Sequence, residues 1–139
     1  MTLENLVRIR ELKKEPPDDR EFEGLVKAAV DRLNDSENTS LSYASRFDLA
    51  YSAAHGLALA ALRTAGYRSD KRYLVFQCLI HTVSLSKAQI RIFSICHDRR
   101  NRAEYEGYLE NDETLLDELI INTKALLRLV LETRGLIQP

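Results

Sequence analysis

Apolar residues recur along this chain every three or four positions, which is the spacing of amphipathic helices rather than of strands. The pattern predicts a short helix over residues 3–12, a second from about 18 to 33 and a long third from about 40 to 65. A fourth is expected over 71–85, a fifth from 87 through 105 and a last from about 112 to 134. We therefore expect an all-α protein, an antiparallel bundle of about four to six helices.

Short polar residues, prolines and glycines mark the predicted helix ends. In chain order these are Pro16 with Pro17, Asp18 or Asp19, Ser40 or Ser42, Gly66, Asp112 or Glu113, and Gly135. Asp and Ser side chains accept hydrogen bonds from the free N–H groups at a helix start, and glycine adopts the left-handed backbone that often follows a helix end. The polar stretch from Asn34 to Thr39 is expected to be a loop between two helices.

A chain of 139 residues is expected to be a single domain, with residues 1–35 as an N-terminal helical extension and residues 40–134 as the core bundle. Small residues are dense between Ala50 and Ala61, so the third helix is expected at the centre, where another helix can approach closely. The fifth helix is apolar on more than one side. It therefore lies in the middle of the bundle or meets a second copy of the chain.

Composition narrows the possible functions. The formal net charge is -1, so any nucleic-acid binding must come from a local basic patch. The chain starts without a secretory leader and has no long apolar run, and it holds only two cysteines. We expect a cytoplasmic protein with reduced thiols and no membrane segment. No cofactor is expected, and no metal site either, because Cys78 and His81 supply only half of a zinc ligand set.

The segment from Asp98 to Gly107 departs from the amphipathic pattern. Its candidate binding residues are Arg99, Arg100, Asn101, Arg102, Glu104 and Tyr105. Arginine presents a rigid fork of donors that suits phosphate or carboxylate. If the helix continues through Tyr105, His97 shares a face with Arg100, Asn101 and Glu104. Alternatively, the arginines only pair with neighbouring carboxylates and close the helix end.

Three stretches of the chain resemble the HEPN family (higher eukaryotes and prokaryotes nucleotide-binding domain). They are Tyr51–His55, Gly66–Arg68 and the run Arg-Asn-Arg-Ala-Glu-Tyr at 100–105. The last is similar to a branch with Arg-Asn-x3-Tyr in place of Arg-x4-His. The resemblance implies a helical homodimer and, for its ribonucleases, metal-independent cleavage in which the ribose 2′-hydroxyl attacks the phosphate. Arg100 matches the arginine that steadies the phosphate, and Tyr105 stands where the histidine moves the proton.

Tyrosine is a poor general base, because its ordinary pKa of about 10 leaves almost no phenolate at neutral pH. His97, one turn before Arg100, could supply an imidazole instead. We therefore expect a HEPN-like protein of a prokaryotic defence or toxin-antitoxin system that binds RNA, a nucleotide or a protein partner without efficient catalysis. The alternatives are an active ribonuclease toxin using Arg100 with Tyr105 or His97, and a purely structural dimerisation module. A nucleotidyltransferase-like antitoxin is the partner that the resemblance implies.

Two charge clusters bear on these alternatives. From Glu104 to Glu118 the chain holds seven acidic residues and no lysine or arginine, which favours a protein partner over extended RNA. A second basic cluster surrounds the predicted helix end at Gly66 and consists of Arg63, Arg68, Lys71 and Arg72. The sequence does not indicate whether this cluster and the arginines near residue 100 lie at the same end of the bundle.

Overall fold

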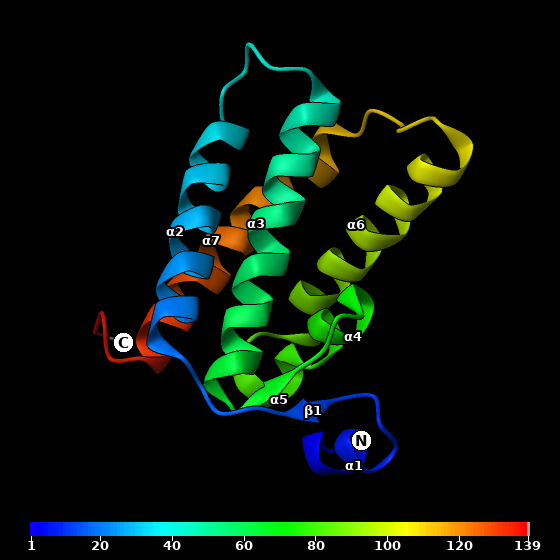
Figure 1. Ribbon diagram of the computed structural model, residues 1–139. Coiled ribbons are helices and arrows are strands. Elements are labelled where there is room, and N and C mark those ends of the chain that lie inside the picture. The colour runs from blue at the N-terminus through cyan, green and yellow to red at the C-terminus, as the bar shows by residue number, and fades with distance from the viewer. Residues whose placement is uncertain (139) are drawn as a thin grey trace.

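The computed structural model describes residues 1–138, in which four long helices form an antiparallel bundle (Figure 1). These are α2 (Asp19–Ser36), α3 (Tyr43–Thr64), α6 (Lys87–Glu106) and α7 (Glu113–Thr133). The shorter elements are α1 (Leu3–Arg8), α4 (Arg72–Gln77), α5 (Leu79–Thr82) and the two-residue strands β1 (Lys13–Lys14) and β2 (Tyr67–Arg68). The predicted all-α helical bundle is confirmed. No helix within residues 1–138 has the length and apolar character that crossing a membrane requires.

The predicted capping residues fix where the long helices begin and end. Asp18, Ser42 and Asp112 each accept a hydrogen bond from the backbone N–H three residues further on, at 3.0–3.2 Å. Gly66 follows the end of α3 with a φ of +93°, a backbone conformation that glycine adopts without strain. The choice between neighbouring candidate caps is thereby settled for α2, α3 and α7.

The expected loop from Asn34 to Thr39 begins later than predicted, because α2 continues to Ser36. Ser36 is fully buried, and its hydroxyl donates to the carbonyl oxygen of Leu33 at 2.6 Å. Arg46 of α3 donates to the Ser36 carbonyl oxygen at 2.7 Å. The side chain of Arg46 thus supplies a hydrogen-bond donor to a free carbonyl oxygen at the end of α2. The run of polar residues in the sequence does not reveal this contact, because Arg46 belongs to the next helix.

The helix predicted over 71–85 is divided and shorter. α4 and α5 are separated at Cys78, and the chain is already extended at Val83. The extended segment leads into Ser86, which forms a capping box with Gln89 at the start of α6. The next helix therefore starts at its own strong cap, and the residues before it cannot remain helical.

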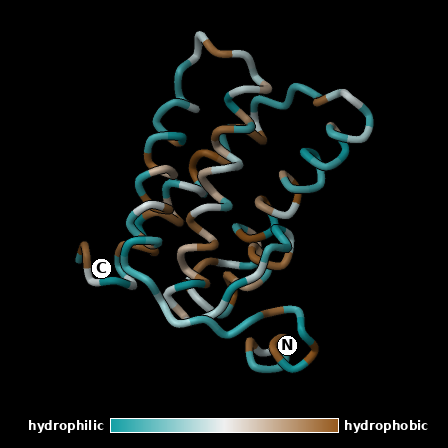
Figure 2. Tube along the Cα trace, viewed as in Figure 1, coloured by the Kyte–Doolittle hydropathy of each residue, from teal (hydrophilic) through white to brown (hydrophobic). Residues whose placement is uncertain are grey.

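α3 lies at the centre of the bundle, as its small residues predict, and packs against both α2 and α7. At Gly56 a Cβ would lie only 3.8 Å from the carbonyl oxygen of Leu25 in α2, so the two helices approach closely. Figure 2 shows α3 as largely hydrophobic and the C-terminal half of α6 as hydrophilic. Ile92 and Ile95 of α6 pack against the core, so packing within one chain accounts for the breadth of its apolar surface.

The N-terminal segment is fastened to the end of α3. β1 pairs antiparallel with β2, with Lys13 opposite Arg68 and Lys14 opposite Tyr67. Of the residues predicted as an N-terminal extension, those of α2 are one of the four long helices, packed on α3. Only α1 and β1 lie outside the four-helix arrangement, beside the C-terminal end of α3 (Figure 1).

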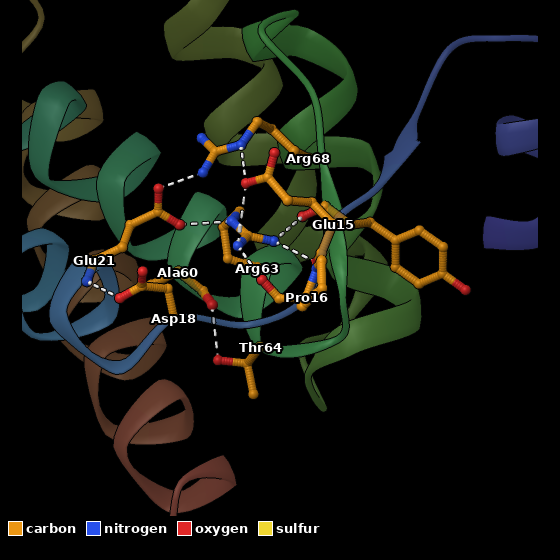
Figure 3. A network of polar contacts seen from close by, with 9 residues as sticks. Glu15, Pro16, Asp18, Glu21, Ala60, Arg63, Thr64 and Arg68 are labelled. Carbon is orange, nitrogen blue, oxygen red and sulfur yellow. Dashed lines mark hydrogen bonds and ion pairs between the residues drawn. The ribbon is translucent and has the colours of Figure 1, made fainter.

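A group that we call the Arg63 network holds this junction together (Figure 3). Arg63 is 3% exposed, and its Nε lies 2.5 Å from a carboxylate oxygen of Glu21. Its terminal nitrogens donate to the carbonyl oxygens of Glu15 at 2.8 Å and Pro16 at 2.6 Å. Arg68 pairs with the carboxylates of both Glu15 and Glu21. Every buried charge in this network therefore has an opposite charge or a carbonyl partner.

Candidate functional site

A chain of three polar side chains connects the middle of α3 to the surface of α6. The hydroxyl oxygen of Tyr51 lies 2.9 Å from Nδ1 of His97, and the other ring nitrogen of His97 lies 3.0 Å from the amide nitrogen of Asn101. Tyr51 is fully buried, whereas His97 and Asn101 are only partly covered. The three connected side chains thus lead from the core towards the solvent along α6.

The amide nitrogen of Asn101 indicates which nitrogen of His97 accepts and which donates a hydrogen bond. An amide nitrogen only donates, so Nε2 of His97 accepts from Asn101. The neutral imidazole then carries its hydrogen on Nδ1 and donates it to the oxygen of Tyr51. Both ring nitrogens of His97 therefore have protein partners, which orients the ring.

Two guanidinium groups approach the same tyrosine. The Cζ atom of Arg100 lies 5.1 Å from the centre of the Tyr51 ring, and that of Arg72 in α4 lies 5.8 Å from it. At such distances a cation is attracted to the ring. We name Tyr51, Arg72, His97, Arg100 and Asn101 together the Tyr51 cluster. Its members come from α3, α4 and α6, so the packing of three helices assembles it.

The cluster holds an excess of positive charge. Arg100 pairs with Glu104 at 3.0 Å, one turn along the same helix, and this carboxylate is mostly exposed. Arg72 makes no ion pair with any residue among 1–138. Burial raises the pKa of Tyr51 above its ordinary value, against the opposing effect of Arg72. The phenol is therefore neutral, and nothing in the cluster itself cancels the two guanidinium charges.

Two histidines register this charge. His55, one turn beyond Tyr51 on α3, has its pKa lowered to about 4, by burial first and then by Arg72 and Arg100. Its Nε2 is buried and has no hydrogen-bond partner within the described part of the chain. Burial also lowers the pKa of His97, and Arg100 acts in the same direction. Both imidazoles are thus neutral at physiological pH.

The structure separates the residues that the sequence grouped around Arg100. Arg99 pairs with Asp112 at 3.5 Å and so ties α6 to the start of α7. Arg102 is exposed. Tyr105 is 91% exposed and makes no contact with the Tyr51 cluster, so the structure places it outside the site. Of the candidate residues, Arg100, Asn101 and His97 come together, with Glu104 at their edge.

A hollow of about 330 Å³ lies on one side of the cluster, between the N-terminal half of α3 and the C-terminal half of α6. Arg100 and Glu104 line it from α6, and Asp48 lines it from α3. Carboxylates therefore share this hollow with the arginine. Among residues 1–138, no group of three or more His, Cys, Asp or Glu side chains is placed to hold a metal ion.

Sequence reasoning missed Tyr51 and Arg72 as site residues. Tyr51 has the helical spacing of a core residue and is indeed buried, but its hydroxyl reaches a histidine 46 positions away. Arg72 stands in the basic cluster around Gly66, whose other members pair with glutamates. Lys71 pairs with Glu11, and Arg63 and Arg68 belong to the Arg63 network. No signal in the sequence separates Arg72 from the other three, because their glutamate partners are distant along the chain.

Comparison with protein-family models, curated proteins and solved structures found no match to this chain. The chemistry of the site must therefore be judged from its geometry. Two guanidinium groups beside a neutral imidazole and an amide can bind an anionic oxygen-rich group such as phosphate, because arginine donates in pairs to its oxygens.

Proposed function

We propose that this chain is an RNA-binding helical domain of the HEPN type, in which the Tyr51 cluster holds a phosphate of single-stranded RNA. The observation that carries the proposal is the pair of guanidinium groups, from Arg72 and Arg100, on one buried tyrosine, of which only Arg100 has an ion-pair partner within residues 1–138, the exposed Glu104. A protein that binds RNA needs such local charge when its net charge is close to zero.

The acidic residues after position 104 oppose phosphate binding less than their number suggests, because some of them pair with arginines. Asp112 is paired with Arg99, and Glu113 lies 3.9 Å from Arg46. These carboxylates are partly neutralised within the fold and repel a nearby phosphate less than free ones do. The acidic stretch therefore leaves room for a short RNA contact, although it disfavours a long backbone-tracking groove.

The test is fluorescence anisotropy with a labelled single-stranded RNA, without divalent metal. Arg100→Ala and Arg72→Ala should each weaken binding by about tenfold or more, since a charge-assisted hydrogen bond contributes about 1.5–3 kcal/mol. Each should also reduce the salt dependence of binding by about one counterion.

Arg32→Ala is the matched control, because Arg32 is exposed on α2, and α3 stands between α2 and α6 (Figure 1). It should bind RNA like the wild type. Equal losses in all three variants would point to general charge attraction, and no loss in any would exclude the Tyr51 cluster as the phosphate site.

A ribonuclease activity is the second candidate, and the neutral imidazole of His97 beside Arg100 is the observation that favours it. Cleavage would need a proton acceptor at the ribose 2′-hydroxyl, and Asn101 occupies the outer nitrogen of His97 at 3.0 Å. Asn101 would have to move away before His97 could act. For this reason binding without efficient cleavage is the function that the geometry supports best.

Incubating labelled RNA with the protein in chelator separates the two candidates. Products with cyclic-phosphate ends that disappear in His97→Gln and persist in Tyr105→Phe would establish catalysis by His97. Loss of cleavage in Tyr105→Phe would instead favour the residue that the HEPN resemblance implies. In either case the setting that we propose is a prokaryotic defence or toxin-antitoxin system, with a homodimer and an antitoxin partner as further predictions of the resemblance.

A further inference from the structure

A second hollow, of about 370 Å³, lies on the other side of His97 from the one that Arg100 lines. Tyr73, Gln77 and Ile80 line it from α4 and α5, and Lys87, Arg91 and Ser94 line it from α6. We name this hollow the Tyr73 groove. Its volume is in the range of small-molecule sites in proteins, and its walls combine an aromatic ring, aliphatic side chains and a few polar groups.

The groove lies beside the Tyr51 cluster, and Tyr73 is the lining residue that approaches it. The ring centre of Tyr73 lies 5.8 Å from that of His97, and Tyr73 follows Arg72 in the chain. Ser94 precedes His97 by one turn of α6. Tyr73 therefore lies where the groove meets His97 of the Tyr51 cluster.

The charges of the groove favour an anionic ligand. No Asp or Glu is among its lining residues, and neither Lys87 nor Arg91 makes an ion pair within residues 1–138. The aromatic ring of Tyr73 is half exposed, at 51%. An exposed ring between two sets of cations is the arrangement on which a nucleic-acid base stacks while the flanking phosphates meet the charges.

The groove also offers groups that can contact the edge of a base. The side-chain amide of Gln77 donates to the hydroxyl of Ser94 at 2.8 Å. This bond joins α4 to α6 across the groove and fixes both side chains. The second amide hydrogen and the amide oxygen of Gln77 remain available to a ligand.

We propose that the Tyr73 groove binds one RNA base, stacked on Tyr73, next to the phosphate held by Arg72 and Arg100. Lys87 and Arg91 then face the following phosphate. This inference rests on the proposed RNA binding and makes it more specific, because it places a base subsite on one defined side of the phosphate site.

The experiment compares short uridine oligonucleotides with copies that carry a single abasic ribose, each position in turn, in the anisotropy assay. At one position the missing base should weaken wild-type binding by roughly tenfold, which is about 1.4 kcal/mol. Tyr73→Ala should show the same loss on the complete oligonucleotide and no additional loss on the abasic one. Tyr73→Phe should retain binding, because stacking needs the ring and not the hydroxyl.

Ile121→Ala is the matched control, since Ile121 is 65% exposed on α7 and lies outside the groove. If Arg100→Ala weakens binding and Tyr73→Ala does not, the base subsite is wrong and the phosphate site remains. If the wild type binds no RNA, both proposals fail together. If Tyr73→Ala converts a dimer to monomers in light scattering, a second copy of the chain occupies the groove and the base subsite is excluded.

Discussion

Two groups of arginines lie at different points along α3, and they differ in how completely the protein satisfies them. In the Arg63 network the guanidinium of Arg63 is buried and meets carboxylates and carbonyl oxygens. In the Tyr51 cluster Arg100 has one exposed carboxylate partner, and its guanidinium lies near an aromatic ring. A buried charge without partners is costly, so complete pairing indicates a structural role, whereas incomplete pairing near the surface leaves donors for a ligand.

The largest effect is expected from removing Arg63, the central arginine of the Arg63 network, which tests whether this network has a structural role. Arg63→Ala should lower the free energy of unfolding by about 3–5 kcal/mol, because it leaves two carbonyl oxygens without their buried donor and leaves Glu21 with Arg68 as its remaining partner. Urea unfolding followed by circular dichroism measures the loss. Arg128→Ala should cost less than about 1 kcal/mol, since Arg128 is exposed on α7 and pairs only with Glu132.

Arg100→Ala provides the opposite case, and it should change the free energy of unfolding by less than about 1 kcal/mol while RNA binding falls. A loss of stability in Arg100→Ala as large as in Arg63→Ala would contradict the comparison. The Tyr51 cluster would then be a second structural network.

A smaller effect comes from His55, whose pKa is lowered mainly by burial and further by the guanidinium groups of Arg72 and Arg100. The pKa is about 4 in the folded protein against an ordinary value of 6.5, so the unfolded chain takes up the proton first as the pH falls. The stability from this group is complete above pH 6.5 and declines as the pH falls towards 4. It should amount to a loss of about 2 kcal/mol between pH 7 and pH 5.

Unfolding at both pH values tests this prediction with His55→Gln, which should flatten the pH dependence. His81→Gln is the control for the substitution itself, because His81 is exposed at the end of α5. An unaltered slope in His55→Gln would mean that the pKa of His55 is not lowered in the fold.

The smallest effect is expected from removing the carboxylate of Glu104, the ion-pair partner of Arg100. Glu104→Gln should alter the free energy of unfolding by less than about 0.5 kcal/mol, because the pair is exposed. It should raise the affinity for single-stranded RNA by about two- to threefold, since the carboxylate no longer competes with phosphate. Weaker binding in this variant would show that Glu104 positions Arg100 for the ligand.

The sequence predicts well what depends on neighbours in the chain. The caps at Asp18 and Ser42 and the glycine at 66 follow from local hydrogen bonds and backbone conformation, and the structure has them in these places. The shared face of His97 and Asn101 follows from helical periodicity in the same way. These features need no knowledge of how the helices pack.

Contacts between distant segments could not be predicted. The four basic residues around Gly66 look equivalent in sequence, yet Arg63 and Arg68 pair with glutamates and Arg72 joins the Tyr51 cluster. The glutamate partners of Arg63 are Glu21, 42 positions away, and Glu15, still further away, and only the packing of distant segments selects them. The same holds for Tyr51, which periodicity marks as an ordinary core residue.

The Arg63 network joins residues 15–21 to residues 63–68, so all of its members belong to the first half of the chain. The most extensive helix packing, between α2 and α3, lies in the same half. During synthesis this half emerges first, and it can form a helical hairpin closed by its own ion pairs before α6 exists. We therefore expect the Tyr51 cluster, which needs residues 72–101, to assemble last, on a framework already in place.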